Sequence, residues 1–382
     1  LQEGKKIYPN DAELLFTEGA LRLENRDYQG AISVYRTLLQ SEDRPHFGSV
    51  VEGLRGSKGK HNLAVALWQS GDQPQAEKLW KEVTQEQPTF LPAYRGLGEA
   101  LLARKDWGTL EEIALQIEPL GTEGRELSLL WRGRMLLQQE RFSVARFNMG
   151  VGASEYPESA EIHGLWAEAC LKEAVDLAET ERAFTGLLKL DPLHPTSRLQ
   201  YALIRAKRKL KLGFDGQVTL DALYNHSVIT PSDINEHLPV LAELARVSPK
   251  IIEMGTRTGE STLALLCGSK EGKVTSYDRI KYPEIDLLEA LTKERYRFIQ
   301  ADVLKIDIEP CDLLFIDTLH DYDQLQMELK LHAPKVKRFL VLHDTTTFGE
   351  HGETPGKPGL WPAVEELLAQ GGWTLLRRYV HN

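Results

Sequence analysis

Small and apolar residues recur along the first half of the chain at spacings typical of paired amphipathic helices. In each unit a small residue is followed twelve positions later by a second small or apolar residue, and a third, usually bulky, residue follows four positions after that. Four units place these residues as follows: Gly19, Ala31 and Tyr35; Ala64, Ala76 and Trp80; Gly98, Leu110 and Ala114; Gly133, Ala145 and Met149. A fifth unit runs from Ile162 to Pro192 and has Phe184 at the bulky position.

The later units recur at about 34 residues, which is the period of tetratricopeptide repeats. Small residues let paired helices approach closely, and prolines such as Pro88 and Pro157 stop the second helix of a pair. An insertion, HFGSVVEGLRGSKGK, separates the first two units, and SRLQYALIRAKRKLKLGF follows the last one as an expected capping helix. We therefore expect an all-α tetratricopeptide solenoid over residues 1–213, whose concave face binds a protein partner or the acceptor.

From about Asp215 the helical period gives way to short β-type runs that alternate with helical stretches. This alternation predicts a second domain over residues 214–382 with the doubly wound α/β fold, also called Rossmann-like. A helix within ITPSDINEHLPVLAELARV is expected to lead into it, with Ser232 or Asp233 as its N-cap. The expected strands are KIIEMG, KVTSYD, YRFIQA, CDLLFID and RFLVLHD, and WTLLRRYV is expected to supply one strand beyond an unfilled position.

Composition narrows the classes of partner. The net charge of −10 argues against nucleic acid, because phosphate binding needs a basic surface. No apolar run approaches the ~20 residues that span a bilayer. The three cysteines lie far apart in apolar runs, which fits a reducing compartment and predicts a cytoplasmic location.

Polar residues gather where the first three expected strands end. In a parallel sheet, ligands bind beyond these carboxyl ends. The first strand runs into Glu253-Met254-Gly255-Thr256-Arg257-Thr258-Gly259-Glu260-Ser261, where two glycines allow a tight turn close to a ligand. Arg257 replaces the middle glycine of the dinucleotide fingerprint, which argues against NAD. Asp278 and Asp302 end the next two strands and are placed to bind ribose hydroxyls and an adenine amine, so we expect a nucleoside-type ligand.

These residues also resemble a known family. IIEMGTRTGESTLALL, with Asp278 and Asp302, resembles the first motifs of class I S-adenosylmethionine-dependent methyltransferases, in the branch with catechol and sugar O-methyltransferases. LLFIDTLHDYDQLQMELKLHAP, FLVLHDTTTFGE and GLWPAVEELLA resemble later motifs of the branch, so the resemblance covers roughly residues 230–382. It implies an S-adenosylmethionine site formed by Glu253, Gly255, Thr256, Gly259, Ser261, Asp278 and Asp302.

The ends of the fourth and fifth strands carry the candidate chemistry. Asp317, His320, His343 and Asp344 should converge there, because these strands are neighbours in the expected sheet order. In metal-dependent sugar O-methyltransferases, which this segment resembles, the matching Asp-x-x-His supplies a metal ligand and a base; this implies Asp317 and His320 as the catalytic pair. The resemblance also implies a Mg²⁺ or Mn²⁺ site at Asp317, His343 and Asp344, although His343 stands where that family has a carboxylate. Alternatively, His343 packs against or caps its strand and Asp344 bonds to loop amides.

A second resemblance concerns the repeats. HFGSVVEGLRGSKGKHNLAVALWQSGDQPQAEKLW is similar to the repeat region that follows the catalytic domain of certain bacterial family-2 glycosyltransferases. Together the two resemblances imply an O-methyltransferase that acts on a sugar hydroxyl of a glycan or glycoconjugate in bacteria. Two alternatives stay open at this point: a non-catalytic interaction module that only binds ligand, and oxidation chemistry as in a cephalosporin-hydroxylase-like group that shares the motifs.

Overall fold

The computed structural model describes residues 1–41 and 52–379. Residue contacts divide the chain into two compact units, Leu1–Glu173 and Ala174–Asn382. The first part of the expected insertion, residues 46–51, lies outside the described residues, as do residues 380–382. We describe each unit by itself.

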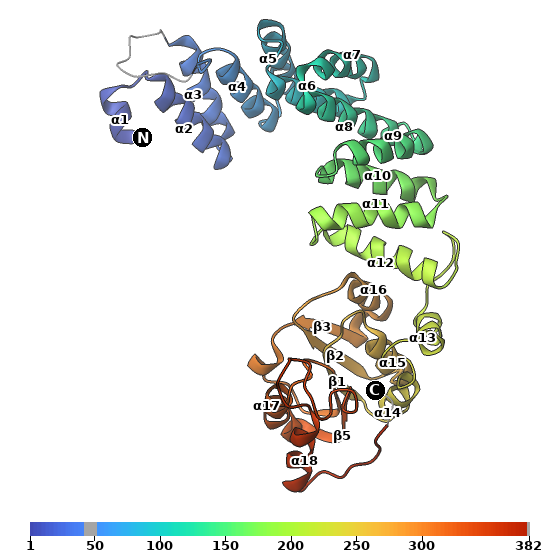
Figure 1. Ribbon diagram of the computed structural model, residues 1–382. Coiled ribbons are helices and arrows are strands. Elements are labelled where there is room, and N and C mark those ends of the chain that lie inside the picture. The colour runs from blue at the N-terminus through green and yellow to red at the C-terminus, as the bar shows by residue number, and fades with distance from the viewer. Residues whose placement is uncertain (42–51, 380–382) are drawn as a thin grey trace. The chain divides into compact units, whose positions relative to one another are not determined.

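The first unit consists of helices arranged in successive antiparallel pairs (Figure 1). The pairs coincide with the repeats that the sequence predicts, and a short helix precedes them. The helices are α1 Gln2–Ile7, α2 Ala12–Glu24, α3 Tyr28–Gln40, α4 Ser57–Gln69, α5 Gln73–Glu86, α6 Leu91–Arg104, α7 Trp107–Ile117, η1 Glu118–Leu120, α8 Thr122–Gln138, α9 Phe142–Glu155 and α10 Ala160–Glu173.

The second helix of several pairs begins in the same way. Asp27, Asp72 and Asp106 each precede such a helix, and each carboxylate accepts a hydrogen bond from the backbone N–H three residues later. This side-chain bond satisfies one of the free amide donors of the first helical turn. The aspartates therefore fix where α3, α5 and α7 begin.

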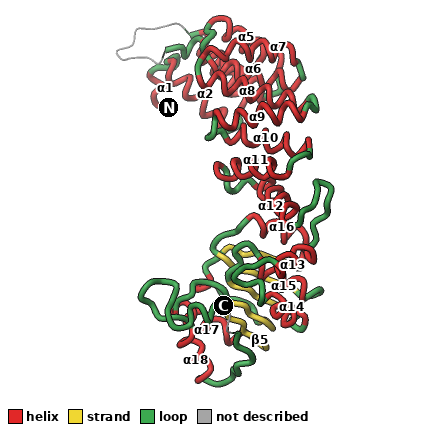
Figure 2. Tube along the Cα trace, turned by 45° about the vertical axis from the view of Figure 1, so that its right-hand side comes forward, coloured by secondary structure: helices red, strands yellow, loops and turns green. Residues whose placement is uncertain are grey.

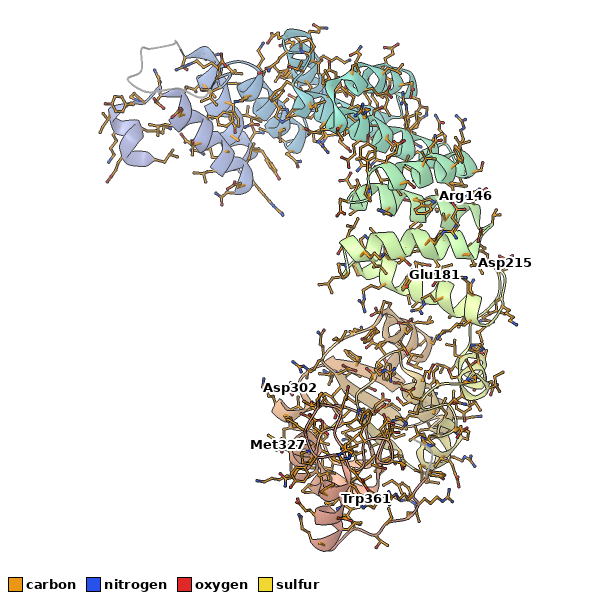
Figure 3. The ribbon with its side chains drawn as sticks, in the orientation of Figure 1. Arg146, Glu181, Asp215, Asp302, Met327 and Trp361 are labelled. Carbon is orange, nitrogen blue, oxygen red and sulfur yellow. The ribbon has the colours of Figure 1, made fainter. Side chains whose placement is uncertain are left out.

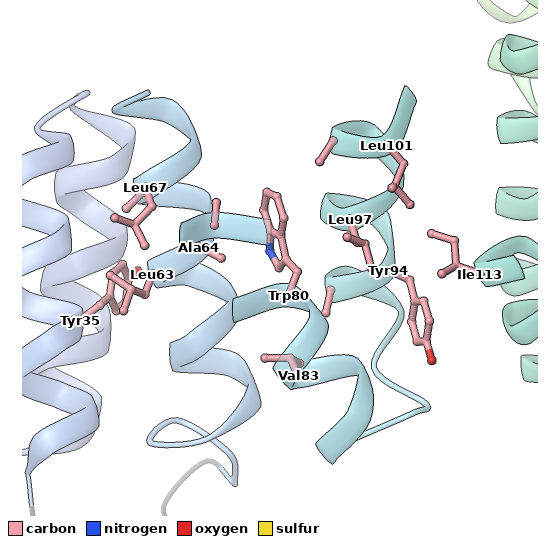
Figure 4. Packing of buried hydrophobic residues seen from close by; sticks show 14 of the residues in the cluster. Tyr35, Leu63, Ala64, Leu67, Trp80, Val83, Tyr94, Leu97, Leu101 and Ile113 are labelled. Carbon is pink, nitrogen blue, oxygen red and sulfur yellow. The ribbon is translucent and has the colours of Figure 1, made fainter. Parts of the chain in front are cut away.

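Close packing explains the small and bulky positions of the repeat. A Cβ placed on Gly19 would lie 2.4 Å from the ring of Tyr35, and one on Gly98 would lie 2.3 Å from the ring of Trp131. Glycine is therefore needed where a large ring from a neighbouring helix covers the backbone. Figure 4 shows this core from α3 to α7, where Tyr35 and Trp80 lie among leucine and alanine side chains.

The second unit contains two further helices, α11 Leu177–Leu190 and α12 Pro195–Lys209, and an α/β part. Within the described residues, five strands form one parallel sheet in the order β3-β2-β1-β4-β5, so the switch point lies between β1 and β4. Figure 1 labels most of these strands, and Figure 2 draws them in yellow. The strands are β1 Lys250–Met254, β2 Lys273–Asp278, β3 Tyr296–Gln300, β4 Cys311–Ile316 and β5 Val336–Leu342. The helices of the α/β part are α13 Leu220–Ile229, α14 Leu238–Arg246, α15 Glu260–Gly268, α16 Pro283–Thr292, η2 Lys293–Arg295, η3 Val303–Lys305, α17 Tyr322–His332, η4 Ala333–Lys335 and α18 Trp361–Ala369.

Helices cover both faces of the sheet. Alternate strand residues such as Ile251 and Leu313 pack with α14, α15 and α16 on one face. Their neighbours Ile252 and Leu314 pack with α17 and α18 on the other face. Both faces of the strands are therefore apolar, as expected for a parallel sheet between two helical layers. This arrangement confirms the predicted combination of a tetratricopeptide-like helical region and an α/β domain.

The contact-defined boundary differs from the one that the repeats predict. The contacts divide the chain after Glu173, not after residue 213, so α11 and α12 belong to the second unit. On α12, Ala202 and Ala206 join the apolar core of the α/β part, and Arg198 bonds to Asp286 of α16 at 2.7 Å. The expected capping helix thus shares its core with the sheet domain, which a repeat period cannot reveal.

Two further details of the second unit differ from expectation. The lead-in helix α14 begins at Leu238 with Pro239 in its first turn, not near Ser232 or Asp233, because proline suits the first helical position. Residues 373–379 of WTLLRRYV form no strand, and the sheet ends at β5 within the described residues. A groove of about 800 Å³ lies between β5, α14 and this segment, where the sequence predicts an unfilled strand position.

Within the described ranges, every helix is too short or too polar to cross a bilayer.

Candidate active site

The loop after β1 has an unusual backbone. Gly255 and Gly259 both have φ of +84°, and Arg257 between them has φ of +45°. A Cβ on Gly255 would lie 1.8 Å from the backbone oxygen of Asp317, so the loop passes against the end of β4. Only glycine fits such a close approach at a positive φ. The loop therefore lies at the switch point, where ligands of these sheets bind.

Asp278 at the end of β2 holds this loop in place. Its Oδ2 accepts hydrogen bonds from the backbone N–H of Thr256 at 2.8 Å and of Arg257 at 3.1 Å, and Oδ1 accepts from Ile280 at 3.1 Å. Burial alone would raise the pKa of the Asp278 carboxyl, but these backbone donors lower it below its ordinary value. The hydroxyl of Thr256 also donates to Oδ2 at 3.1 Å, so Oδ2 accepts three hydrogen bonds, whereas Oδ1 accepts one and keeps capacity for a ligand hydroxyl.

Glu253 lies beneath the loop and does not face a ligand. Its side chain is fully buried, and its oxygens accept hydrogen bonds from the hydroxyls of Ser261 at 2.6 Å, Thr262 at 2.7 Å and Ser276. Burial raises the pKa of Glu253 to about 7, although the three hydroxyl donors act against this rise. The buried Glu253 carboxylate thus ties β1 and β2 to the start of α15, and contacts from Glu253 and Ser261 to the cofactor stay a prediction.

Asp302 follows β3 at the same edge of the sheet (Figure 3). Its Oδ1 accepts a hydrogen bond from the N–H of Leu304 at 3.1 Å and its other oxygen pairs with Lys305 at 3.2 Å. The hydrogen bond from the Leu304 N–H, and to a smaller extent the interaction with Lys305, holds the pKa of the Asp302 carboxyl below its ordinary value. Asp302 therefore caps η3, and a contact to an adenine amine stays a prediction.

Four side chains meet at the ends of β4 and β5; we call them the strand-end cluster, defined as Asp317, His320, His343 and Asp344. Nε2 of His320 lies 3.2 Å from Oδ1 of Asp317 and 3.4 Å from Oδ2 of Asp344. Nδ1 of His343 lies 3.4 Å from those same two oxygens. Asp344 has φ of +55°, a strained conformation for a non-glycine residue, and its carboxylate joins the cluster. The convergence that the sequence predicts is therefore present.

The carboxylates of the cluster favour positive charge on both imidazoles. Burial would lower the pKa of His343, but interaction with Asp317 and Asp344 raises it to about 10. For His320 as well, burial acts to lower the pKa, and Asp317 together with Glu353 raises it above its ordinary value. Conversely, the pKa of Asp317 is held well below its usual range by the two imidazoles, in spite of burial.

Two acidic residues that sequence reasoning did not select take part in the site. Glu353, in the glycine- and proline-rich loop before α18, places Oε2 3.0 Å from Nδ1 of His320. Glu328 on α17 is buried and accepts a hydrogen bond from the hydroxyl of Thr318 at 2.6 Å. Burial raises the pKa of Glu328 to about 7. The ring of Phe348 stacks on His320, with 4.8 Å between centroids. Asp317, Glu353 and Phe348 therefore fix the position of the His320 imidazole.

Part of the second unit is similar to a known protein family. Residues 252–345 match a family model described as a methyltransferase domain. This match spans β1 to the end of β5, including the loop, Asp278 and the strand-end cluster. No curated protein matches the chain.

Several solved structures resemble parts of the chain. A thermophilic tetratricopeptide protein of Thermus thermophilus shares 17% identity, and the match covers 51% of this chain and 99% of that one, with a TM-score of 0.37. A putative caffeoyl-CoA O-methyltransferase from Staphylococcus aureus shares 16%, covering 46% and 91%, with a TM-score of 0.33. Human N-acetylserotonin methyltransferase in complex with SAM shares 18%, covering 47% and 50%, with a TM-score of 0.22.

Proposed function

We propose that the second unit transfers a methyl group from S-adenosylmethionine to a hydroxyl of a sugar or glycoconjugate. The observation that carries the proposal is the juxtaposition at the switch point. A glycine loop fixed by Asp278 lies beside a cluster that contains a histidine bracketed by carboxylates. The resemblance of the cluster's motifs to sugar O-methyltransferases supports the choice of acceptor.

The residues of the loop fit the cofactor in shape and chemistry. A Cβ at Gly255 would lie 1.8 Å from the backbone oxygen of Asp317 and one at Gly259 would lie 2.7 Å from Leu288, so the tight turn of the loop needs glycine at both positions. In this proposal Asp278 accepts hydrogen bonds from the ribose hydroxyls, Thr256 lines the loop and Asp302 accepts one from the adenine amine; the bonds between Asp278 and the loop support this assignment. When bound, S-adenosylmethionine supplies a methyl group on a sulfonium, which is already a good leaving group.

His320 is the proposed general base. Its Nδ1 faces Glu353, so Nε2 is the nitrogen on the side of Asp317 and Asp344. Nε2 would accept the proton of the acceptor hydroxyl as its oxygen takes the methyl group, which bound S-adenosylmethionine would supply before departing as S-adenosylhomocysteine. The neighbouring carboxylates stabilise the imidazolium that forms. Because they also raise the pKa of His320, the rate should increase as pH rises through a value above the ordinary 6.5.

The Mg²⁺ that the resemblance implies does not suit the residues present. Mg²⁺ binds through oxygen and demands nearly ideal octahedral geometry. His343 offers an imidazole where a third carboxylate would be needed, so we route no step of the transfer through Mg²⁺.

The repeats are proposed to bind a protein partner or a larger acceptor, in a cytoplasmic pathway of bacterial glycan synthesis. The rival proposal is a binding module without turnover. A transfer assay separates the two proposals: the full chain is incubated with methyl-labelled S-adenosylmethionine and a panel of deoxysugar nucleotides and glycosylated peptides. We expect His320→Ala to lower turnover about 10²–10⁴-fold while cofactor binding persists. Transfer at the wild-type rate in that variant would refute the mechanism.

A further inference from the structure

One helix of the repeats has an exposed apolar face. On α9, the side chains of Val144, Phe147 and Val151 are 38%, 68% and 46% exposed. Their successive spacings of three and four residues place them on one face of the helix; we call them the α9 stripe. Large apolar side chains that gather on one exposed face indicate an interaction site, whereas single ones scattered over a surface do not.

Equivalent positions in three other repeats carry no large apolar side chain. The α9 stripe lies one residue before, two after and six after Ala145, the second small position of its unit. The same offsets from Ala31, Ala76 and Leu110 give Gly30, Ser33 and Thr37 on α3, Gln75, Lys78 and Glu82 on α5, and Thr109, Glu112 and Gln116 on α7. Packing within the repeat therefore does not require the α9 stripe, which points to a contact with another molecule.

The charges at the two ends of the stripe oppose the dipole of their own helix. Arg141 is the N-cap of α9 and Glu155 is its last residue, and both side chains are exposed. A helix dipole favours negative charge at the N-terminus and positive charge at the C-terminus, which is the reverse of this arrangement. Arg141 lies three residues before Val144 and Glu155 four residues after Val151, so the two charges flank the stripe on its own face.

A second copy of α9 in the antiparallel direction suits both the stripe and its charges. A two-fold axis near Phe147 brings Val144 opposite Val151 of the second copy, because an isologous contact uses the same face twice. Arg141 then lies beside Glu155 and the helix C-terminus of the second copy, where its charge is favoured. Parallel pairing would instead bring like charges together. We propose that the chain forms a homodimer through antiparallel packing of two α9 stripes.

Dimer formation is measured without methyl transfer, by sedimentation velocity of the full chain over a range of micromolar concentrations. A single pair of helices buries less surface than a standard interface, so we expect a dimer that dissociates in the micromolar range. Phe147→Glu places a charge at the centre of the contact and should raise the dissociation constant at least about 30-fold. The matched control Leu21→Glu alters an exposed leucine of α2 and should dimerise like the wild type.

Two charge reversals test the antiparallel direction. Arg141→Glu brings two glutamates together across the axis, and Glu155→Arg brings two arginines together. Each variant alone should therefore have a dissociation constant about tenfold higher than that of the wild type. An equimolar mixture of the two variants should associate as tightly as the wild type, because every charge pair across the axis is again of opposite sign.

The outcomes decide between a second copy and another occupant of the stripe. A folded wild type that stays monomeric at the highest concentration overturns the inference and leaves the stripe to a different protein. A Phe147→Glu variant that dimerises like the wild type also overturns it. If the mixed charge variants associate no more tightly than each variant alone, antiparallel pairing is wrong. Thermal unfolding of each variant identifies any loss of folding, and the Leu21→Glu control identifies any general effect of an added surface charge.

Discussion

Replacing Glu253 by glutamine should change how the second unit's stability depends on pH. Glu253 is fully buried under the loop after β1, and its pKa rises from an ordinary 4.5 to about 7 in the folded chain. Between these values the folded state keeps a proton that the unfolded state has lost. The free energy of unfolding therefore falls as pH rises from about 4.5 to about 7, and is constant above that.

The size of the effect follows from the two pKa values. One unit of pKa corresponds to about 1.4 kcal/mol, so the rise to about 7 amounts to about 3 kcal/mol over this pH range. Glu253→Gln keeps the shape and the hydrogen-bonding capacity toward Ser261, Thr262 and Ser276 but has no proton to lose. The wild type should thus lose about 3 kcal/mol relative to Glu253→Gln between pH 4.5 and pH 7.

Urea unfolding measures the free energy of unfolding of the second unit, with pulsed hydrogen exchange of the β1 amides as the readout. The matched control is Glu271→Gln, an exposed glutamate of the same unit, which should keep the wild-type dependence on pH. If the wild type and Glu253→Gln show the same dependence on pH, Glu253 is not a protonated buried acid, and the reasoning about the support of the loop is wrong.

Three further predictions address the base, the repeats and the loop. Glu353→Gln removes a carboxylate that raises the pKa of His320. Activity should therefore begin to increase at a lower pH in this variant, and an unchanged pH–rate profile would show that Glu353 does not act on His320. Gly98→Ala forces a methyl group against Trp131 and should lower the free energy of unfolding of the first unit by about 1–3 kcal/mol. In the control Gly164→Ala the added methyl group meets nothing within 4 Å, so thermal unfolding should show a neutral or stabilising effect. Gly255→Ala places a Cβ 1.8 Å from the backbone of Asp317 at a positive φ, so it should destabilise the second unit and abolish cofactor binding; wild-type affinity in calorimetry would contradict the close approach.

The sequence predicts much of this architecture because the relevant signals are local. The five strands are short apolar runs, and their order along the chain places Asp278, Asp317 and Asp344 at one edge of a parallel sheet. Asp317 and His320 are only three residues apart in the loop after β4, and Nε2 of His320 lies 3.2 Å from Oδ1 of Asp317. These features depend on period and position, which are visible in one chain.

The features that sequence reasoning missed depend on tertiary contacts. Glu353 lies 33 residues after His320 in a loop without a periodic pattern, and nothing in that loop indicates its contact with the imidazole. The sequence places Glu253 at the end of a strand, and a glutamate there can either contact a ligand or be buried beneath the loop. Its burial therefore could not be predicted from the sequence. Arg198 and Arg205 of α12 pair with acids of α16, and nothing in the sequence of the expected capping helix indicates these contacts.

Calorimetry with S-adenosylmethionine and S-adenosylhomocysteine tests the central claim most directly. We expect the full chain to bind both, and Asp278→Ala to weaken binding by about 1–3 kcal/mol, which is about fivefold to 150-fold, because polar groups lose their partner. Asp215→Ala, which alters an exposed acid far along the chain from the site residues (labelled in Figure 3), should bind like the wild type. If the folded wild type binds neither compound, or if Asp278→Ala binds as tightly as the wild type, the assignment of a cofactor site at this edge of the sheet is contradicted.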